Sequence, residues 1–182
     1  MFRVALLAAV LLPLPGVRAQ DPEKKGPPAA DLLAEGLAKA KKDDKRVFLV
    51  FGSPTCGWCK YLDKYHADAE VEKVVGKYFV IVKVDVVTNP GGEEMYRKYG
   101  TDRGVPAFTV LDADAKVLAD SGDGDKNVGF PYEEKEIEHY AKVLKTSLPK
   151  VTEAEVELLV RKLREAGPKK DKKELKSEVK DR

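Results

Sequence analysis

Two cysteines, Cys56 and Cys59, are the residues whose type and spacing most directly predict chemistry in this chain. They are its only cysteines, and Gly57 and Trp58 separate them. An apolar run typical of a buried strand precedes the pair, and a segment that can form a helix follows it. A thiol at a helix N-terminus lies among unpaired backbone N–H groups and the positive end of the helix dipole, which both favour the thiolate. The pattern predicts a redox-active dithiol in which Cys56 attacks and Cys59 resolves the mixed disulfide.

The elements that must hold this dithiol can be located from apolar periodicity and turn residues. Residues 47–51 form a continuous apolar run, which predicts a strand covered on both faces. Gly52, Ser53 and Pro54 end that strand, and a helix from about residue 57 to 67 follows. The strongest strand pattern of the chain is at residues 78–86.

The remaining pattern predicts further helices and a hairpin. Asp31 is expected to cap a helix, and a capping box at residues 152–155 starts a last helix whose apolar stripe should pack on the domain. The acidic loop 121–125 lacks the regular ligand pattern of a calcium loop. The other expected elements are helices at 70–76 and 132–148, a short helix that follows a turn at 89–92 and ends at Gly100, a strand at 104–111 and its hairpin partner at 116–119.

The sequence around the cysteines resembles the thioredoxin superfamily. The resemblance covers residues 31–148 and is carried by segments 47–60, 83–90 and 98–106. It implies a thioredoxin-like α/β fold with a central mixed β-sheet flanked by helices, to which this chain adds a C-terminal helical extension. More narrowly, the chain looks like exported thioredoxin-like domains of bacterial envelopes.

The resemblance also implies roles for individual residues. Val105 and Pro106 should form a cis peptide beside the sulfurs and pair with extended substrate backbone, and Trp58 should be an exposed apolar substrate contact. Gly57, Lys60 and Lys83 are expected to support the site, with Lys60 solvated on the helix.

Two departures from the family pattern bear on mechanism. Cytoplasmic thioredoxins carry a buried acid six residues before the first cysteine, where this chain has Val50. Proton transfer would then need another group or water, and Lys83 is expected to lose its partner. The dipeptide Gly57-Trp58 replaces Gly-Pro and looks more like bacterial disulfide isomerases than strongly reducing members, although this sequence is not expected to contain the dimerisation domain of those isomerases.

The N-terminus predicts export. Residues 1–19 combine a short positive region, an apolar core at 4–14 and a small-residue cleavage site, which together are typical of a signal peptide. A membrane anchor is the rival interpretation, but the apolar core is shorter than the roughly 20 residues that a spanning helix needs. We therefore expect a periplasmic or secreted protein with no membrane span after cleavage.

Composition sets the remaining boundaries. Residues 20–30 are rich in proline, glycine and charge and predict a mobile linker, residues 31–149 the domain, 150–167 the last helix and 168–182 a disordered charged tail. The counts of 33 Lys+Arg and 31 Asp+Glu leave a net charge of +2. This balance argues against a nucleic-acid partner.

The expected function is extracytoplasmic thiol-disulfide exchange with protein thiols and disulfides, recharged by a membrane or periplasmic redox partner. No cofactor is expected beyond the internal disulfide of Cys56 and Cys59. A purely structural disulfide is a weak explanation, because closing so short a loop removes little chain entropy. Two alternatives remain open: a binding scaffold with an idle disulfide, and a metal-handling dithiol, for copper or for a site completed by His66 and His139.

Overall fold

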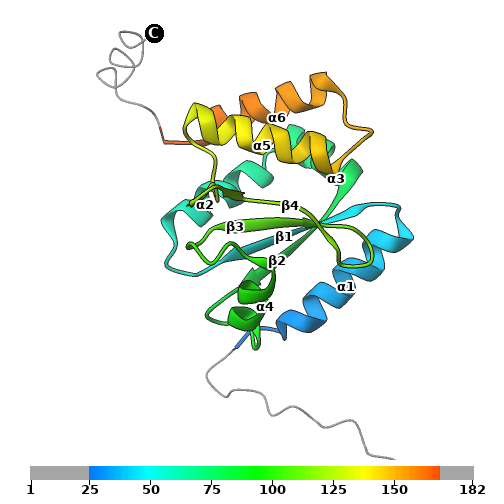
Figure 1. Cartoon of the computed structure of the whole chain (residues 1–182), viewed down its shortest axis with the longest axis vertical. Helices are drawn as coiled ribbons and strands as arrows, with labels where there is room; N and C mark the ends of the chain where they lie inside the picture. Colours follow the sequence, from blue (N-terminus) through cyan, green and yellow to red (C-terminus); the bar gives the residue numbers. More distant parts are fainter. Residues whose placement is uncertain (1–24, 169–182) are drawn as a thin grey trace, which may run out of the picture.

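Four strands form a mixed sheet between two layers of helices (Figure 1). The computed structural model describes residues 25–168. The strand order is β2-β1-β3-β4, in which β1 runs parallel to β2 and antiparallel to β3, and β4 pairs antiparallel with β3. The predicted central mixed sheet is therefore confirmed. The strands are β1 (Arg46–Gly52), β2 (Phe79–Asp85), β3 (Ala107–Leu111) and β4 (Val117–Asp120).

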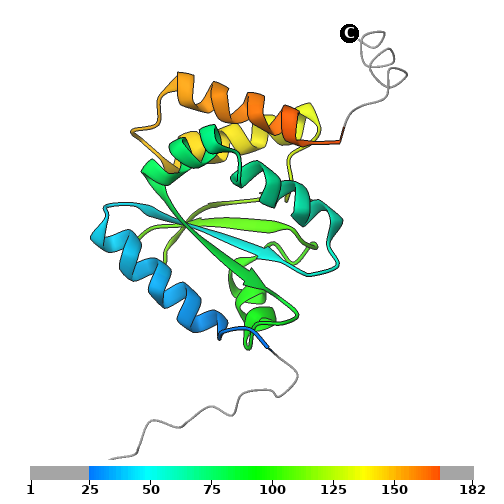
Figure 2. The ribbon, with the colours of Figure 1, turned by 180° about the vertical axis from the view of Figure 1, so that it is seen from behind.

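The helices divide unequally between the two faces of the sheet (Figures 1 and 2). One face carries α1 (Ala29–Lys42) and α4 (Gly92–Tyr99). The other carries α2, α3, α5 and α6, and a two-stranded hairpin, β5 and β6, follows β4. These elements are α2 (Gly57–His66), α3 (Ala69–Tyr78), α5 (Glu134–Ser147), α6 (Glu153–Ala166), β5 (Gly122–Asp123) and β6 (Lys126–Asn127).

Strand β1 lies at the centre because its side chains supply both cores. Phe48 and Val50 belong to the core under α2, α3, α5 and α6, whereas Val47, Leu49 and Phe51 belong to the core under α1 and α4. Side chains of a strand alternate between its faces, so a strand buried on both sides must be apolar throughout. The run of five buried apolar residues in β1 confirms the prediction made from its sequence.

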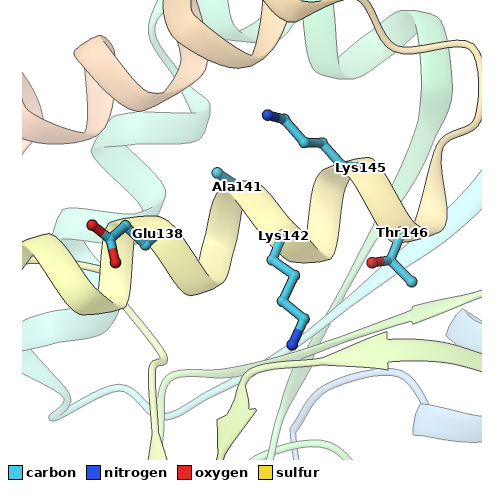
Figure 3. A pocket seen from close by; sticks show the side chains of 5 residues that line it. All are labelled: Glu138, Ala141, Lys142, Lys145 and Thr146. Atoms are coloured by element: carbon cyan, nitrogen blue, oxygen red, sulfur yellow. The ribbon is translucent and has the colours of Figure 1, made fainter.

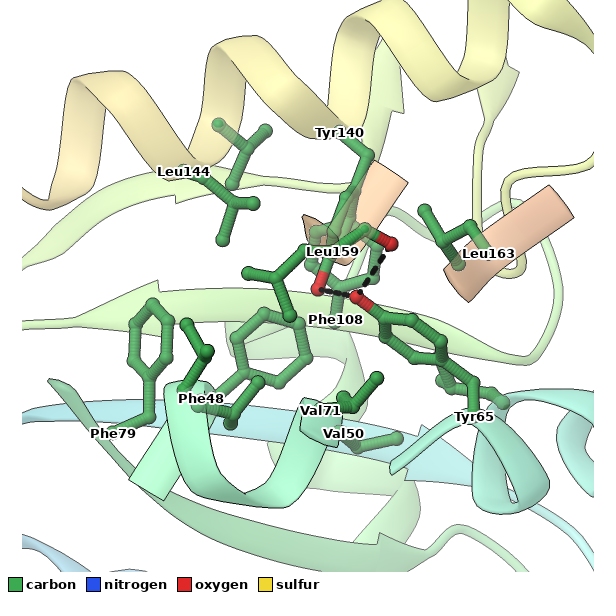
Figure 4. Packing of buried hydrophobic residues seen from close by; sticks show 14 of the residues in the cluster. Phe48, Val50, Tyr65, Val71, Phe79, Phe108, Tyr140, Leu144, Leu159 and Leu163 are labelled. Atoms are coloured by element: carbon green, nitrogen blue, oxygen red, sulfur yellow. Dashed lines mark hydrogen bonds between the residues drawn. The ribbon is translucent and has the colours of Figure 1, made fainter. Parts of the chain in front are cut away.

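The last helix, α6, is part of the larger core (Figure 4). Its residues Val156, Leu159 and Leu163 are buried, which confirms that the apolar stripe packs on the domain. The Tyr65 hydroxyl of α2 donates to the Leu159 carbonyl of α6 at 3.3 Å and lies 3.4 Å from the Tyr140 hydroxyl of α5. Burial raises the pKa of Tyr140 to about 12 and that of Tyr65 well above its ordinary value, so both hydroxyls stay protonated. Three helices therefore meet at this buried pair.

The start of α1 differs from its prediction. The helix begins at Ala29 with Pro28 at the N-cap, and Asp31 lies inside the first turn, where its backbone N–H already donates to the Pro28 carbonyl. The preceding residues are also held, since Gly26 N–H donates to the Thr88 carbonyl. The described end of the expected mobile linker is thus bonded to the loop after β2.

Two other boundaries were predicted wrongly. Strand β3 begins at Ala107, because Gly104 has a positive φ of 96° and Pro106 has no N–H to offer a neighbouring strand. The loop predicted at 121–125 instead contributes strand β5. The expected signal segment 1–19 and nearly all of the expected tail lie outside the described residues. No helix between residues 25 and 168 has the length and apolar character needed to cross a membrane.

Candidate active site

The two cysteines form a disulfide at the N-terminus of α2. Cys56 is the N-cap residue, positioned by a turn after β1 in which its N–H donates to the Ser53 carbonyl. The Cys59 N–H donates to the Cys56 sulfur at 3.1 Å. The first turn of α2 carries no acidic side chain. After reduction, the same N–H and the positive end of the helix would stabilise a thiolate on Cys56.

The Val105–Pro106 loop lies against this disulfide. Its peptide bond is cis, as the resemblance implied. The Val105 carbonyl oxygen is 3.4 Å from the Cys56 sulfur, and Pro106 lines a small cavity together with Cys59. The structure therefore brings these four residues, far apart in the sequence, to one place.

Three residues that the sequence did not point to hold this loop. The Tyr96 hydroxyl accepts from the Gly104 N–H at 2.9 Å and lies 3.0 Å from the Gly104 carbonyl. The Asn127 amide donates to the carbonyls of Gly104 and Pro106 at 2.9 and 2.8 Å. Gly129 packs so closely that a Cβ there would lie 1.7 Å from the Pro106 carbonyl oxygen. No signal in the local sequence marks any of the three as part of the site.

A cavity of about 130 Å³ opens beside Cys59. Val50, where the family has an acid, is one of its apolar walls, whereas Asp63, Lys83 and Asp85 are its charged lining residues. The Lys83 and Asp63 side chains form an ion pair, so Lys83, which lacks the family's acid at position 50, has a different partner. Asp63 lies one turn beyond Cys59 on α2 and reaches β2 from there. Both charged groups are about half exposed, at 58% and 54%, so the pair contributes little stability.

The other residues expected near the motif are placed as follows. Trp58 is exposed, with 46% of its surface accessible, and Gly57 and Lys60 are also exposed at the start of α2. The roles assigned to them remain predictions. Gly57 has no heavy atom within 4 Å of the place where a Cβ would stand, so packing does not explain a glycine there.

Neither histidine joins the cysteines. His66 is buried against the rings of Phe48 and Tyr65, and its ring nitrogens have no hydrogen-bond partner among the described residues. Burial, assisted by the positive charge of Lys83, lowers the pKa of His66 to about 4, so the ring is neutral near pH 7. His139 instead contacts the Asp120 carbonyl at 3.1 Å. Within residues 25–168, no three His, Cys, Asp or Glu side chains are grouped to hold a metal ion.

A second surface depression, about 490 Å³ in volume, lies along α5 (Figure 3). All of its lining residues come from this one helix. None of the bonds described above joins them to the disulfide or to its facing loop. The lining residues are Glu138, Ala141, Lys142, Lys145 and Thr146. We therefore assign the candidate site to the disulfide and its facing loop.

Comparison with known proteins finds matches to the part of the chain that contains the candidate site. Residues 30–119 match the family model Thioredox_DsbH, described as a protein of unknown function, DUF255. This match runs from α1 to β4 and includes both cysteines and the facing loop. The chain is also 33% identical over 66 residues to an uncharacterized protein of Caenorhabditis elegans and 32% identical over 66 residues to spermatogenesis-associated protein 20 of Homo sapiens. It spans only 9% and 8% of the length of these two relatives.

A solved structure extends the likeness to most of the fold. The disulphide isomerase from Xylella fastidiosa Temecula1 superposes with a TM-score of 0.53 and 26% sequence identity, over 75% of this chain and 98% of that protein. The element order, the cysteine pair at the start of α2 and the opposing cis-proline loop agree with this likeness. The chain belongs to the thioredoxin superfamily.

Proposed function

We propose that this protein is a thiol-disulfide oxidoreductase that exchanges disulfides with other proteins through Cys56 and Cys59. The observation that carries the proposal is the disulfide at the N-cap of α2, with the Cys59 N–H directed at the Cys56 sulfur and the Val105–Pro106 loop beside it. Similarity to a protein described as a disulphide isomerase supports it. The redox group is then the internal disulfide itself.

The proposed exchange proceeds in two steps. In the reduced protein, the Cys56 thiolate attacks one sulfur of a substrate disulfide, forms a mixed disulfide and releases the other substrate sulfur as a thiolate. Cys59 then loses its proton and attacks the Cys56 sulfur, which releases the second substrate thiolate and forms the Cys56–Cys59 disulfide. The protein loses two electrons and the substrate disulfide gains them. The reverse sequence oxidises a substrate dithiol.

Geometry gives the neighbouring groups defined tasks in this scheme. The Cys59 N–H stabilises charge on the Cys56 sulfur, both when it attacks and when it leaves. Main-chain groups of Val105 bind extended substrate backbone beside that sulfur, while Pro106 bounds the cavity next to Cys59. The Asp63 carboxylate, which is paired with the Lys83 ammonium, lines this cavity and is available to accept the Cys59 proton, directly or through a water molecule that enters the cavity.

We also propose that the protein acts outside the cytoplasm. Support comes from the signal-like composition of residues 1–19 and from the likeness to a bacterial disulphide isomerase. A second thiol protein, in the periplasm or anchored to the membrane, would return the Cys56–Cys59 pair to its working redox state. The direction of exchange follows from the reduction potential of the pair relative to that partner.

Insulin reduction by dithiothreitol tests the proposal. The wild-type protein is expected to accelerate precipitation of the insulin B chain catalytically. Cys56→Ser is expected to abolish this activity without unfolding the protein, because serine is also a good N-cap residue. Cys59→Ser is expected to accumulate a mixed disulfide that mass spectrometry detects. Wild-type protein with no activity above that of Cys56→Ser would contradict the function and favour a scaffold with an idle disulfide.

A further inference from the structure

Four aromatic rings gather beside the disulfide. Trp58 lies between the two cysteines in sequence, and its ring centroid is 5.5 Å from that of Tyr61, 6.1 Å from Phe130 and 5.7 Å from Tyr132. Tyr61 and Phe130 are also 5.7 Å apart. These separations are in the range of direct aromatic contact. We call the four residues the aromatic platform.

The platform combines a buried base with an exposed top. Phe130 is buried, Tyr61 and Tyr132 are half-buried, and Trp58 is 46% exposed. Two other large apolar side chains in the described chain are exposed, Val87 and Val117. Neither of them is part of an aromatic cluster. The platform is thus an aromatic surface that includes Trp58, in the same first turn of α2 as the two cysteines.

The end of the last helix supports the platform from behind. At Gly167, which caps α6, a Cβ would lie 3.1 Å from the Tyr132 ring and 3.6 Å from the Phe130 ring. Arg164 of α6 makes two hydrogen bonds with Glu134 of α5, at 3.1 and 2.8 Å. The C-terminal helix therefore fixes the segment that carries two of the four rings.

The segment between the β5–β6 hairpin and α5 is also held by contacts at its two ends. The carboxylate of Glu136 accepts the Tyr132 N–H at 2.8 Å and the Glu133 N–H at 3.0 Å, as part of the capping box of α5. Upstream, Gly129 packs on the Pro106 carbonyl. The backbone that presents Phe130 and Tyr132 is therefore held at both ends, next to the loop that faces the disulfide.

We propose that the aromatic platform binds an aromatic or large aliphatic side chain of the substrate polypeptide, one or two residues from its reacting cysteine, and that α6 holds the platform in place. This inference rests on the proposed function and adds a substrate preference to it. A substrate sulfur bonded to Cys56 lies next to Trp58, and one or two residues of extended chain span about 3.5 to 7 Å. A side chain at that position starts from the turn that carries Trp58, whose ring is in contact with the other three rings of the platform. The four rings carry no formal charge, so they favour an apolar side chain over an ionic one.

Paired peptides test this preference. Each peptide carries a single cysteine as a mixed disulfide with glutathione, flanked by tryptophan or leucine in one peptide and by serine in the other. Fully reduced full-length protein is mixed with each peptide, and glutathione release is timed. We expect the apolar peptide to react about tenfold faster than the serine peptide, the size of effect that one aromatic contact can produce.

Variants connect the preference to the platform. Tyr132→Ser is expected to reduce the rate ratio to about threefold or less, and Tyr132→Phe, which keeps the ring, is expected to restore it. Val117→Ser, an exposed apolar residue on β4, is the matched control and should keep the wild-type ratio. Trp58→Ser repeats the comparison at an exposed position, so the test stands even where Tyr132→Ser does not fold.

Two results would overturn the inference while leaving the proposed function intact. One is a wild-type ratio near one. The other is a wild-type ratio that Tyr132→Ser and Trp58→Ser both leave unchanged. If the protein exchanges with neither peptide nor with oxidised glutathione, the result instead contradicts the proposed function. The substrate preference is then contradicted as well.

Discussion

The two ends of helix α2 lie in opposite surroundings. Its N-terminal end carries Cys56 and the exposed Trp58, whereas its C-terminal end carries Tyr65 and His66, both buried in the core. At the first end, the Cys59 backbone N–H is directed at a sulfur; at the second, side chains of α2 pack on β1, α5 and α6. The buried end therefore anchors the helix, and the open end presents the cysteine pair.

Removing a buried contact at the anchored end should produce the largest change in stability. Leu159 of α6 is 1% exposed and lies where Tyr65 bonds to that helix. Leu159→Ala is expected to lower the free energy of unfolding by about 2–5 kcal/mol, because it deletes buried methyl groups and leaves a cavity. Urea unfolding measures this change.

Glu157→Ala, an exposed position on the same helix, is the control and should change the stability by less than about 0.5 kcal/mol. A loss at Leu159 no larger than this control would mean that α6 does not anchor α2.

Acid should weaken the anchored end through His66. The folded pKa of about 4 lies below the unfolded value of about 6.5, so between these two pH values the unfolded state binds more protons. Stability should therefore fall as pH decreases from 6.5 to 4, by on the order of 3 kcal/mol. His66→Phe is expected to remove this slope, as measured by urea unfolding at several pH values.

Below about pH 4, the pH dependence of stability is expected to come from a different group, Glu155. Hydrogen bonds from Lys77, then from Tyr78, lower the pKa of Glu155 to about 2, so its contribution is lost only as pH falls from about 4.5 to 2. An equal slope between pH 6.5 and 4 in wild type and His66→Phe would show that His66 does not titrate as its burial predicts.

The smallest effect is expected midway along α2, at Asp63. Asp63→Asn breaks the pair with Lys83, and because both groups are half exposed, stability should change by less than about 1 kcal/mol. The Lys83 charge left in the cavity beside Cys59 should favour the thiolate and so lower the pKa of the reduced Cys59 thiol. Thiolate absorbance in the Cys56→Ser background measures this shift. An increase in that pKa would show that Lys83 does not act on Cys59.

Periodicity and local motifs were sufficient to predict most of the fold. The five apolar residues of β1, the strand at β2, the β3–β4 hairpin and the capping box of α6 each leave a signal within a few residues. The start of α1 was missed because Pro28 caps it through backbone conformation, with no side-chain bond. The late start of β3 follows from the positive φ of Gly104, which sequence alone does not reveal.

The candidate site also has one part that local sequence predicts and another part that it does not. The cysteine pair and the cis Val105–Pro106 peptide follow a family pattern that can be read locally. Partners that meet only in three dimensions cannot be read in this way, since Asp63 reaches Lys83 across 20 residues and Asn127 reaches Pro106 across 21. Their side-chain types are ordinary surface types, so nothing in their immediate sequence distinguishes them.

The central claim is that the open end of α2 makes Cys56 the nucleophile. Thiolate absorbance of the fully reduced protein, titrated from pH 3 to 11 in Cys59→Ser, measures the pKa of Cys56 directly. We predict a value within the range of about 3.5–7.5 seen for activated cysteines, below the ordinary value of about 8.5. A pKa at or above 8.5, in a protein that remains folded, would contradict the account.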